Sequence, residues 1–418
     1  MATWTTRSSR VVARSSAVRP FAKRRILLGV TGGIASYKSA SLARLLTQAG
    51  GEVDVVLTRS AQEFVGAITF EALTGRPVHT ALIAAGHALD HIKLARAADV
   101  VVVAPATADL LARAAHGHAD DLLTAALLAT TAPVLIAPAM NDRMWGHPQT
   151  TRNVAHLREI GYHVIDPDTG DLAVGEGSGP GRMPEPETIM AHIGRLLETP
   201  SPLRGRRVVI TAGPTREAVD PVRFLSNRSS GKMGVAIAEA AWRRGASVHL
   251  IAGPLGITPP AMLEVERVES AEQMKDAVAR ALASADVLVM AAAPADFRPA
   301  DVAGSKIKKG AAPAAIPLSS SPDILLETAA QRRKGAIVVG FALETDDVIA
   351  NAHKKLAAKG LDLIVVNDAR ETGAGFEGDT NRVTFIASDG SSEALPLLSK
   401  RDVGDAILDR VEALLGGR

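Results

Sequence analysis

The chain has no cysteine among its 418 residues, and aromatic side chains make up only 3% of it. The absence of cysteine excludes disulfides, thiolate-bound zinc and a cysteine nucleophile, and it fits a reducing cytoplasm. An excess of charge of one sign is missing too, since 47 Lys and Arg stand against 45 Asp and Glu. We therefore expect no nucleic-acid partner, because so small a net charge attracts phosphate backbones weakly.

Uncharged segments long enough to cross a bilayer are scarce, and only residues 122–141 form one. Pro133 and Pro138 interrupt this segment, which is better explained by an alanine-rich helix followed by a buried strand at 132–137. We therefore expect no membrane partner.

The domain plan follows from length and composition. A chain of 418 residues predicts two compact units. Residues 1–24 are rich in Arg, Ser and Thr without any acid, which resembles an organelle transit peptide but is predicted to be a disordered basic tail. The proline-rich segment 199–205 is the expected linker, so the domains are predicted at 25–198 and 206–418.

Short apolar runs alternate with segments of helical spacing in both halves. Strands are predicted at 25–30, 52–57, 99–104, 133–137 and 163–165, and again at 207–211, 247–251, 286–291, 336–340 and 362–366. This alternation predicts the α/β class, with two doubly wound, mostly parallel sheets.

A glycine turn, Gly32-Gly33, follows the first predicted strand and opens a predicted helix. Such turns present unpaired amides to phosphates, although they also serve simply as tight turns. The three-glycine dinucleotide spacing is absent, which favours a mononucleotide over NAD. Later strand ends carry hydroxyl groups, at Thr58, Ser60 and Thr107.

Four motifs in order carry a resemblance: GVTGGIASYK (29–38), HIKL (91–94), APATADL (104–110) and PAMNDRMW (138–145). Together they resemble the flavin-dependent cysteine decarboxylases, specifically the phosphopantothenoylcysteine decarboxylases, over residues 25–197. The resemblance implies a flavodoxin-like or Rossmann-like domain with bound FMN, which oxidises the substrate thiol to a thioaldehyde so that the adjacent carboxylate is easily lost.

The resemblance also assigns roles to residues. His91 is implied as the active-site base or charge stabiliser, Asn141 as the group that holds the substrate carboxylate, and Met144 as a substrate contact. Without the motifs, these three would be explained as a surface histidine, a turn residue and a core residue. The implied flavin contacts are Gly32, Gly33, Ile34, Ala35, Thr58, Ser60, Phe64, Ala106 and Thr107.

One departure concerns the glycine-rich segment 172–182, which resembles a flexible lid over the substrate. The family commonly has a cysteine there as proton donor to the enethiolate, whereas this chain has Val174. Either another group or water supplies the proton, or the decarboxylase half is slow or incomplete.

The second half carries TAGPTRE (211–217), SNRSSGKMG (226–234), AAAPADFR (291–298), SPDIL (321–325) and GFALET (340–345). No Walker spacing is present. The set resembles phosphopantothenate-cysteine ligases from residue 206 to the end. It implies that CTP activates a carboxylate as an acyl-cytidylate, that the amine of cysteine displaces CMP, and that Mg²⁺ accompanies the triphosphate.

In the ligase half, Lys306 is implied to neutralise the departing pyrophosphate and Asn227 to hold the acyl intermediate. A solvated basic loop or helix face is the alternative for the lysines. Pro294 and Ser321 depart from the usual pattern, and no metal-ligating set is identified. The implied nucleotide and substrate contacts are Met290, Ala291, Ala292, Asp296, Pro322, Asp323, Ile324, Leu325, Phe341, Lys355 and Lys359.

The combined prediction is a cytoplasmic bifunctional enzyme of coenzyme A biosynthesis, whose ligase product feeds its decarboxylase. Its partners are small molecules, namely 4′-phosphopantothenate, cysteine and CTP. By resemblance it is a homo-oligomer with trimeric decarboxylase and dimeric ligase contacts, compatible with a dodecamer. The alternatives are a ligase with an impaired decarboxylase, a non-catalytic regulatory flavoprotein, another flavin-dependent decarboxylase or prenyltransferase, and an NAD oxidoreductase.

Overall fold

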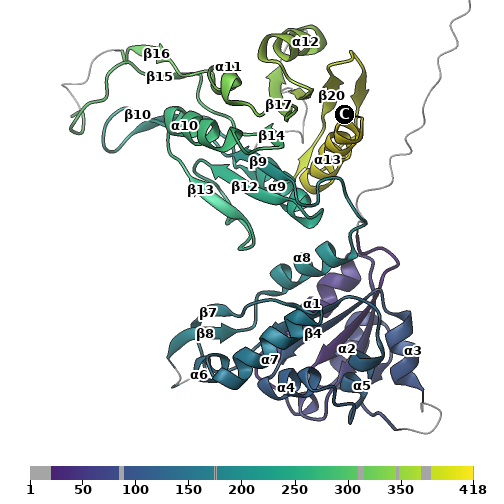
Figure 1. Ribbon diagram of the computed structural model, residues 1–418. Helices are drawn as coiled ribbons and strands as arrows, with labels where there is room; N and C mark the ends of the chain where they lie inside the picture. The colour runs from purple at the N-terminus through teal and green to yellow at the C-terminus, as the bar shows by residue number, and fades with distance from the viewer. Residues whose placement is uncertain are drawn as a thin grey trace, which may run out of the picture.

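The computed structural model describes residues 20–83, 89–173, 175, 177–308, 315–344, 348–368 and 378–417. Within these ranges the chain forms two α/β domains, each built on one large sheet with helices on both faces (Figure 1). The predicted fold class is confirmed.

The first domain has a parallel sheet in the order β3-β2-β1-β4-β5-β6. This is the Rossmann order and not the flavodoxin-like one. The strands are β1 (Arg25–Val30), β2 (Glu52–Leu57), β3 (Val78–His79), β4 (Val100–Ala106), β5 (Val134–Pro138) and β6 (His163–Val164), followed by the hairpin β7 (Asp168–Asp171) and β8 (Ser178–Arg182). The helices are α1 (Ser36–Gln48), α2 (Ala67–Thr74), α3 (Asp90–Ala97), α4 (Ala108–Ala115), α5 (Leu122–Ala129), α6 (Asp142–Trp145), α7 (Pro148–Glu159) and α8 (Pro186–Leu197).

The second domain has a larger sheet, in the order β13-β12-β9-β14-β17-β18-β20-β21. Its first six strands are parallel and repeat the order of the first domain, while β20 and β21 add an antiparallel edge. The sheet strands are β9 (Arg207–Ala212), β12 (Ser247–Ala252), β13 (Glu264–Arg267), β14 (Val287–Met290), β17 (Ile337–Glu344), β18 (Leu363–Asp368), β20 (Thr384–Ala387) and β21 (Ser392–Ala394). The helices are α9 (Lys232–Arg243), α10 (Ala271–Leu282), α11 (Ile324–Glu327), α12 (Val348–Lys359) and α13 (Lys400–Gly416).

Each sheet is buried on both faces, which explains why the strand sequences are continuous apolar runs. The strand β4, for example, reads VVVVAPA and is buried at every position. In the first domain α1 and α8 cover one face and α4, α5 and α7 the other. In the second domain α9 and α13 share one face, and α10 and α12 cover the opposite one.

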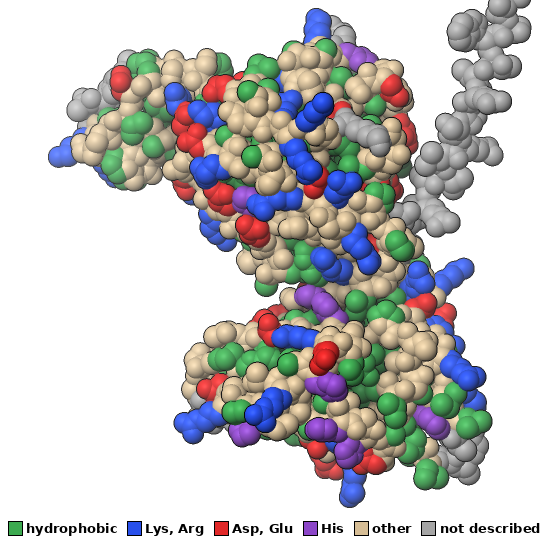
Figure 2. Space-filling model, viewed as in Figure 1, with side chains coloured by type: hydrophobic (Ala, Val, Ile, Leu, Met, Phe, Trp, Pro, Cys, Tyr) green, Lys and Arg blue, Asp and Glu red, His purple; other side chains and the backbone are tan. Residues whose placement is uncertain are grey.

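Four short strands of the second domain form an arm beside its main sheet (Figure 1). They are β10 (Arg216–Ala218), β11 (Phe224–Ser226), β15 (Phe297–Pro299) and β16 (Leu318–Ser320), and a further short pair is β19 (Thr380–Asn381) with β22 (Leu398–Ser399). Figure 2 shows hydrophobic side chains on the surface of this arm. They include Val222, Phe224, Phe297 and Leu318, whose exposed fractions lie between 49% and 59%.

The two domains meet where α8 packs on α9 (Figure 1). The edge of His192 packs against the ring of Trp242, with centroids 4.9 Å apart. Arg195 lies 4.5 Å above the same ring, and its guanidinium donates to the carbonyl oxygen of Trp242 at 2.7 Å. Beside them the buried Arg243 pairs with Glu198 at 2.8 Å and with Asp405. The junction is therefore a packed interface.

Two residues outside the predicted domain bounds pack in the domain cores. Phe21, placed by the sequence analysis in the disordered tail, is 1% exposed in the first core, and the N–H of Lys23 donates to the carbonyl of Gly50 at 3.0 Å. Leu203, placed in the linker, is fully buried in the second core because the chain turns back onto α9 there. In the part of the chain that is described, no helix has the length and apolarity needed to span a membrane.

Candidate functional site

A cavity of about 540 Å³ lies at the carboxyl ends of β1, β4 and β5. The strand order reverses between β1 and β4, and ligands of doubly wound sheets bind in the crevice at such a point. The lining residues are Gly32, Gly33, Ile34, Ala35, Tyr37, Lys38, Thr107, Ala108, Ala139, Met140, Asn141, Met144, Asp171, Leu172, Ala173, Gly181, Arg182 and Met183.

The turn between β1 and α1 allows close approach of a phosphate. A Cβ atom on Gly32 would lie 2.3 Å from the Cβ of Ser60, so only glycine fits there. Ala35, the N-cap of α1, provides no side-chain hydrogen bond to the first turn, which leaves amide donors for a ligand. The N–H of Thr107 donates to Thr31 Oγ1 at 3.1 Å and so ties the ends of β4 and β1 together.

Asn141 is held by the helix that it begins. Its Oδ1 accepts the N–H of Arg143 at 2.9 Å, which leaves the Nδ2 group as the donor toward the cavity. The β7–β8 hairpin packs on the same loop, since a Cβ on Gly181 would lie 2.2 Å from the carbonyl oxygen of Met140. The hairpin occupies the segment predicted as a lid, but Val174 lies outside the described residues.

Lys38 is a wall residue that the sequence analysis missed. Its side chain is 9% exposed, and its Nζ donates to the carbonyl of Met183 at 3.0 Å and to Glu185 at 2.7 Å. These two hydrogen bonds hold the segment just after β8 against α1. Lys38 belongs to the first flavin motif, but no spacing in the sequence indicates that its ammonium reaches residue 183.

The predicted residues of this site divide into two sets. Thr58 Oγ1 accepts the N–H of Ala61 within a local turn, at 3.3 Å, and the Phe64 ring is 54% exposed. Those that line the cavity are Gly32, Gly33, Ile34, Ala35, Thr107, Asn141 and Met144, and those that do not are Thr58, Ser60, Phe64 and Ala106.

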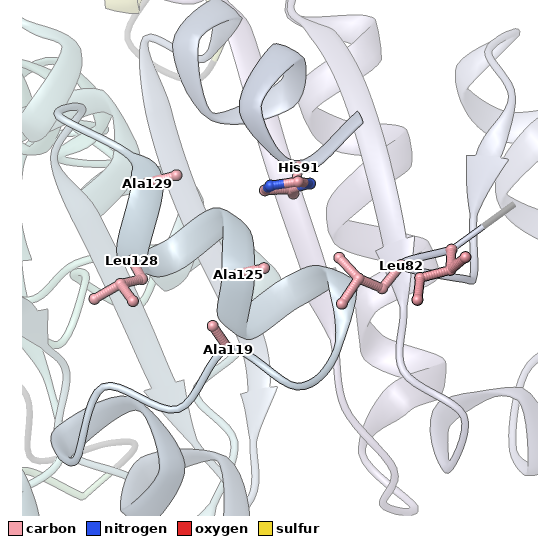
Figure 3. A pocket seen from close by; sticks show the side chains of 7 residues that line it. Leu82, His91, Ala119, Ala125, Leu128 and Ala129 are labelled. Carbon is pink, nitrogen blue, oxygen red and sulfur yellow. The ribbon is translucent and has the colours of Figure 1, made fainter. Parts of the chain in front are cut away.

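His91 lines a different cavity, also of about 540 Å³, between α3 and α5 (Figure 3). Its Nδ1 atom is buried and has no hydrogen-bond partner among the described residues. This cavity and the one beside Asn141 have no lining residue in common. The predicted pair is therefore not brought together within one chain. The lining residues are Leu82, Ile83, His91, Ala119, Ala125, Leu128 and Ala129.

The second domain has a cavity of about 580 Å³ at the carboxyl edge of its own sheet. It also lies where the strand order reverses, between β9 and β14. The lining residues are Asn227, Ser229, Gly231, Lys232, Met233, Gly234, Ala291, Ala292, Ala293, Pro294, Asp296, Phe341, Ala342, Lys355, Asn367, Asn381 and Lys400.

Six of the predicted ligase residues line this cavity, from loops far apart in the sequence. They are Asn227, Ala291, Ala292, Asp296, Phe341 and Lys355. Met290 does not line it, because its side chain is buried beneath, with Sδ 3.7 Å from the hydroxyl of Thr211.

A second set of predicted residues lies beside the cavity without lining it: Pro322, Asp323, Ile324, Leu325 and Lys359. Lys359 Nζ pairs with Asp323 Oδ2 at 2.8 Å, so this lysine is held to the start of α11. The N–H of Ser321 donates to the carbonyl of Asp296 at 2.9 Å, which connects this segment to the cavity wall.

Lys306 is exposed and does not line the cavity. The loop that carries it is anchored next to it, where Asp220 Oδ2 accepts the N–H of Ile307 at 3.2 Å and Arg223 donates to the Ile307 carbonyl at 3.0 Å. The hydrogen bond from Arg223 holds the pKa of Asp220 well below its usual range. The anchor therefore stays charged at neutral pH.

The side-chain amide of Asn227 donates both of its hydrogens to the loop after β14. Its Nδ2 donates to the carbonyl oxygens of Ala293 at 3.1 Å and Pro294 at 2.9 Å. Pro294, one of the departures noted above, thus contributes only a carbonyl at this point. The group that Asn227 leaves for a ligand is its acceptor, Oδ1.

Five polar residues of the cavity wall had no role assigned from the sequence: Ser229, Lys232, Asn367, Asn381 and Lys400. Lys232 pairs with Asp379 at 2.6 Å, and Asn367 Nδ2 donates to Asn381 Oδ1 at 2.8 Å. Burial lowers the pKa of Lys400, and the charge of Lys232 lowers it further. Within the described residues no three His, Asp or Glu side chains are grouped so as to hold a metal ion.

Two family models together match nearly the whole chain. A model described as "Flavoprotein" matches residues 14–198, and one described as "DNA/pantothenate metabolism flavoprotein C-terminal domain" matches residues 203–415. The boundary between them falls at the domain junction.

Curated relatives match the chain through both domains. The coenzyme A biosynthesis bifunctional protein CoaBC of Mycobacterium tuberculosis is 50% identical, over 94% of this chain and 97% of that one. The protein of the same description from Bacillus subtilis is 48% identical, with the same coverage of both chains. A crystal structure of a CoaBC C-terminal domain is 40% identical over 52% of this chain and all of that one, with a TM-score of 0.45. A PPC decarboxylase mutant complexed with pantothenoylaminoethenethiol is 34% identical over 41% and 96%, with a TM-score of 0.37.

The match extends through both domains, so a regulatory flavoprotein or an NAD oxidoreductase is not favoured. The chain belongs to the family of bifunctional coenzyme A biosynthesis proteins, enzymes that join a flavoprotein decarboxylase to a ligase.

Proposed function

We propose that the second domain condenses 4′-phosphopantothenate with cysteine at the cost of CTP, and that the first domain decarboxylates the product to 4′-phosphopantetheine. The observation that carries the proposal is that each domain has its own cavity, of about 540 and 580 Å³, at the reversal point of its sheet. Both volumes fall in the range of small-molecule sites. Two such cavities fit two consecutive reactions on one chain.

FMN is the flavin that fits the first cavity. Gly32 permits close approach of backbone to a phosphate, and the uncapped start of α1 offers amide donors to it. Gly33, Ile34, Ala35 and Thr107 would flank the nucleotide, while Thr58, Ser60, Phe64 and Ala106 remain predictions. When bound, FMN supplies the two-electron oxidation of the thiol that makes the carboxylate labile.

Asn141 would hold the carboxylate that leaves as carbon dioxide. Its Oδ1 is fixed by the N–H of Arg143, so the Nδ2 donor has a defined position for an acceptor such as a carboxylate. Met144, next to it and 49% exposed, would contact the apolar part of the substrate.

We propose that His91 serves the decarboxylase site of a neighbouring subunit. In one chain His91 and Asn141 line separate cavities, and His91 carries a buried, unpaired Nδ1 among the described residues. Two hydrophobic residues that line that cavity, Ile83 and Leu128, are 87% and 63% exposed, as expected for a surface that a partner covers. The arrangement supports trimeric contacts for this domain.

In the second domain, the carboxylate of the acid substrate would attack the α-phosphorus of CTP and release pyrophosphate, after which the amine of cysteine would release CMP. Asn227 Oδ1 is the acceptor available to orient that amine, since both of its N–H groups are engaged. Ala291, Ala292, Phe341 and Lys355 line the space for the nucleotide. Lys306, on its anchored loop, would approach the pyrophosphate.

Magnesium would arrive with the nucleotide. Asp296 is the one acidic residue among the described residues that line the cavity, and Mg²⁺ bound to substrate phosphates commonly needs only one or two carboxylates. Asp296 would hold the ion through a single ligand or through water. The segment of Pro322 to Leu325, together with Lys359, would support the loop that carries Asp296.

The exposed hydrophobic side chains of the arm support dimeric contacts in the ligase half. Trimeric and dimeric contacts on one chain are compatible with a closed dodecamer. The phosphorylated and nucleotide substrates are metabolites of the cytoplasm, where we place the protein.

The test supplies 4′-phosphopantothenate, cysteine, Mg²⁺ and either CTP or ATP to the purified protein, and follows pyrophosphate, carbon dioxide and 4′-phosphopantetheine separately. All three products with CTP, from a yellow protein with a flavin spectrum, are expected. Pyrophosphate without carbon dioxide would contradict the second step and direct attention to Val174. A colourless, flavin-free protein would overturn the assignment of the first cavity.

A further inference from the structure

Arg332 joins two helices of the second domain through their backbones. It lies in the segment between α11 and β17, and its Nη1 donates to the carbonyl oxygens of Lys359 at 2.9 Å and Gly360 at 3.1 Å. Its Nη2 donates to the carbonyl oxygen of Leu325 at 2.6 Å. Lys359 is the last residue of α12, and Leu325 belongs to α11. One side chain therefore holds α11 to the end of α12.

The acceptors of Arg332 lie where helices leave carbonyl oxygens without a partner. The last four carbonyl oxygens of an α-helix have no intrahelical donor, and a cation at the C-terminus also interacts favourably with the helix dipole. The planar guanidinium carries five N–H donors in a fixed fork, so it can serve carbonyls that belong to two helices. An arginine therefore suits this place better than a single-point donor such as lysine.

The position of Arg332 also has a cost. The residue is partly buried, and its Nε atom is buried without a hydrogen-bond partner among the described residues. Burial lowers the pKa of Arg332, although the charge of Asp362 raises it. A long side chain also loses rotamer freedom when it is fixed. An apolar side chain would avoid these costs, so packing alone does not explain an arginine here.

The helix that Arg332 holds forms part of the wall of the ligase cavity. Lys355, one turn before the end of α12, lines the cavity, whereas Arg332 does not. Lys359 Nζ pairs with Asp323 Oδ2 at 2.8 Å, which is a second connection between α12 and α11. Asp323, the N-cap of α11, follows the segment that the N–H of Ser321 bonds to the cavity wall. The place of α12 beside the cavity therefore depends on its contacts with α11.

Resting on the proposed ligase function, we propose that Arg332 is a positioning residue of the nucleotide site, which fixes the end of α12 against α11 so that Lys355 faces CTP. The residue acts through the helix and does not touch the substrates. If α12 takes the binding position only part of the time, the apparent affinity for CTP decreases with the fraction of molecules that are competent. At saturating CTP the nucleotide itself holds the helix, so the turnover rate is preserved.

The substitution Arg332→Met removes the guanidinium and keeps an unbranched stem. Leu325 and Leu356 still pack in one core, so the variant should fold. With saturating 4′-phosphopantothenate and cysteine, the KM for CTP should rise about tenfold, as expected if roughly one molecule in ten is competent, while kcat stays within about twofold. Pyrophosphate release measures both. Arg332→Lys should raise the KM less, because an ammonium can still donate to the carbonyls of one helix.

The matched control is Arg333→Met, at the next residue of the chain. The Arg333 side chain is 51% exposed and pairs with Asp286 at 2.6 Å, outside the cavity, so its loss should leave KM and kcat unchanged. An unchanged KM for CTP in Arg332→Met, with a lower kcat or melting temperature, would show a purely structural role and overturn the proposal. So would a rise confined to the KM for 4′-phosphopantothenate or cysteine. If the unaltered protein releases no pyrophosphate with any nucleotide, the proposed ligase function fails instead.

Hydrogen exchange gives a second readout that does not depend on activity. Without nucleotide, the amides of residues 352–359 should exchange faster in Arg332→Met than in the unaltered protein, because the end of α12 opens more easily. Saturating CTP should slow this exchange back toward that of the unaltered protein. The amides of α9 serve as the internal reference and should not change. Exchange in α12 that the substitution leaves unaltered would contradict the proposal.

Discussion

The two domains share one strand order but assemble their sites differently. In the second domain a single cavity gathers Asn227, Asp296, Phe341 and Lys355. In the first domain His91 and Asn141 lie in separate cavities, although each cavity is as large as a ligand site. If His91 serves a neighbouring subunit, as proposed, the decarboxylase site needs a second chain, whereas most of the predicted ligase wall comes from a single chain.

The largest effects are expected when the asparagine proposed to bind substrate is replaced in each domain in turn. Asn141→Asp puts a carboxylate where the substrate carboxylate should bind, and we expect decarboxylation to fall about a hundred- to a thousandfold, as for loss of a positioned donor. Pyrophosphate release should be unchanged. Asn227→Asp should do the reverse, because its carboxylate would face the carbonyls of Ala293 and Pro294. If either variant impaired both reactions equally, the two sites would not be independent.

The requirement for a second chain is tested by mixing two inactive proteins. Subunits with His91→Ala and subunits with Asn141→Asp are co-expressed with different tags, and oligomers that contain both are purified. If each site takes His91 from one subunit and Asn141 from its neighbour, about a quarter of the sites regain both residues in random assemblies. Carbon dioxide release from phosphopantothenoylcysteine measures the recovery.

Each variant assembled alone is the control for that mixture. Recovery no greater than the sum of the two separate proteins would place both residues in the site of a single chain, and the comparison drawn above would fail.

A smaller effect is expected from the carboxylate of the ligase cavity. Asp296→Asn should raise the KM for Mg–CTP about tenfold, because a neutral ligand holds the ion less well. Decarboxylation of supplied phosphopantothenoylcysteine should not change. Asp301→Asn, at an exposed position on the following loop, is the control. An unchanged KM in the Asp296 variant would remove this residue from the nucleotide site.

The smallest effect concerns the junction between the domains. Burial, the charge of His163 and the charge of Arg195 lower the pKa of His192 from 6.5 to about 4. The folded protein therefore binds fewer protons than the unfolded chain between these values, and the free energy of unfolding should decrease as the pH falls from 6.5 toward 4. Denaturant unfolding at several pH values measures the slope.

Removal of the titrating ring should make that slope shallower. His192→Gln is compared with His116→Gln, which alters an exposed histidine at the end of α4 and should leave the slope as it was. Equal slopes for both variants would show that His192 does not contribute.

Much of the fold was predictable because buried parallel strands leave a clear pattern. The predicted strands 25–30 and 52–57 coincide with β1 and β2, since continuous apolar runs end at turns. Phe21 was misplaced because one aromatic residue within a basic segment carries no periodicity. Leu203 was assigned to the linker because the two prolines that precede it do not reveal where its side chain packs.

The site was predictable only where motifs follow strands directly. Lys355 and Lys359 lie one helical turn apart, yet only Lys355 lines the cavity, because Lys359 pairs with Asp323. Lys400 gave no signal in the sequence, since its place in the cavity wall depends on how α13 packs beside α9. His91 belongs to a recognisable motif, but no motif tells which chain a residue serves. Val174, the main departure, lies outside the described residues and its consequence remains a prediction.

Helix α9 has 12 residues and therefore spans about 18 Å. Its first residue, Lys232, forms part of the ligase wall, while Trp242 and Arg243 at its other end contact Arg195 and Glu198 of the first domain. The same helix therefore contributes one residue to the wall of the ligase cavity and two residues to the surface on which the first domain packs. A ligase fragment cut at the linker therefore loses the packing of α8 against the helix that begins in the wall of its own cavity.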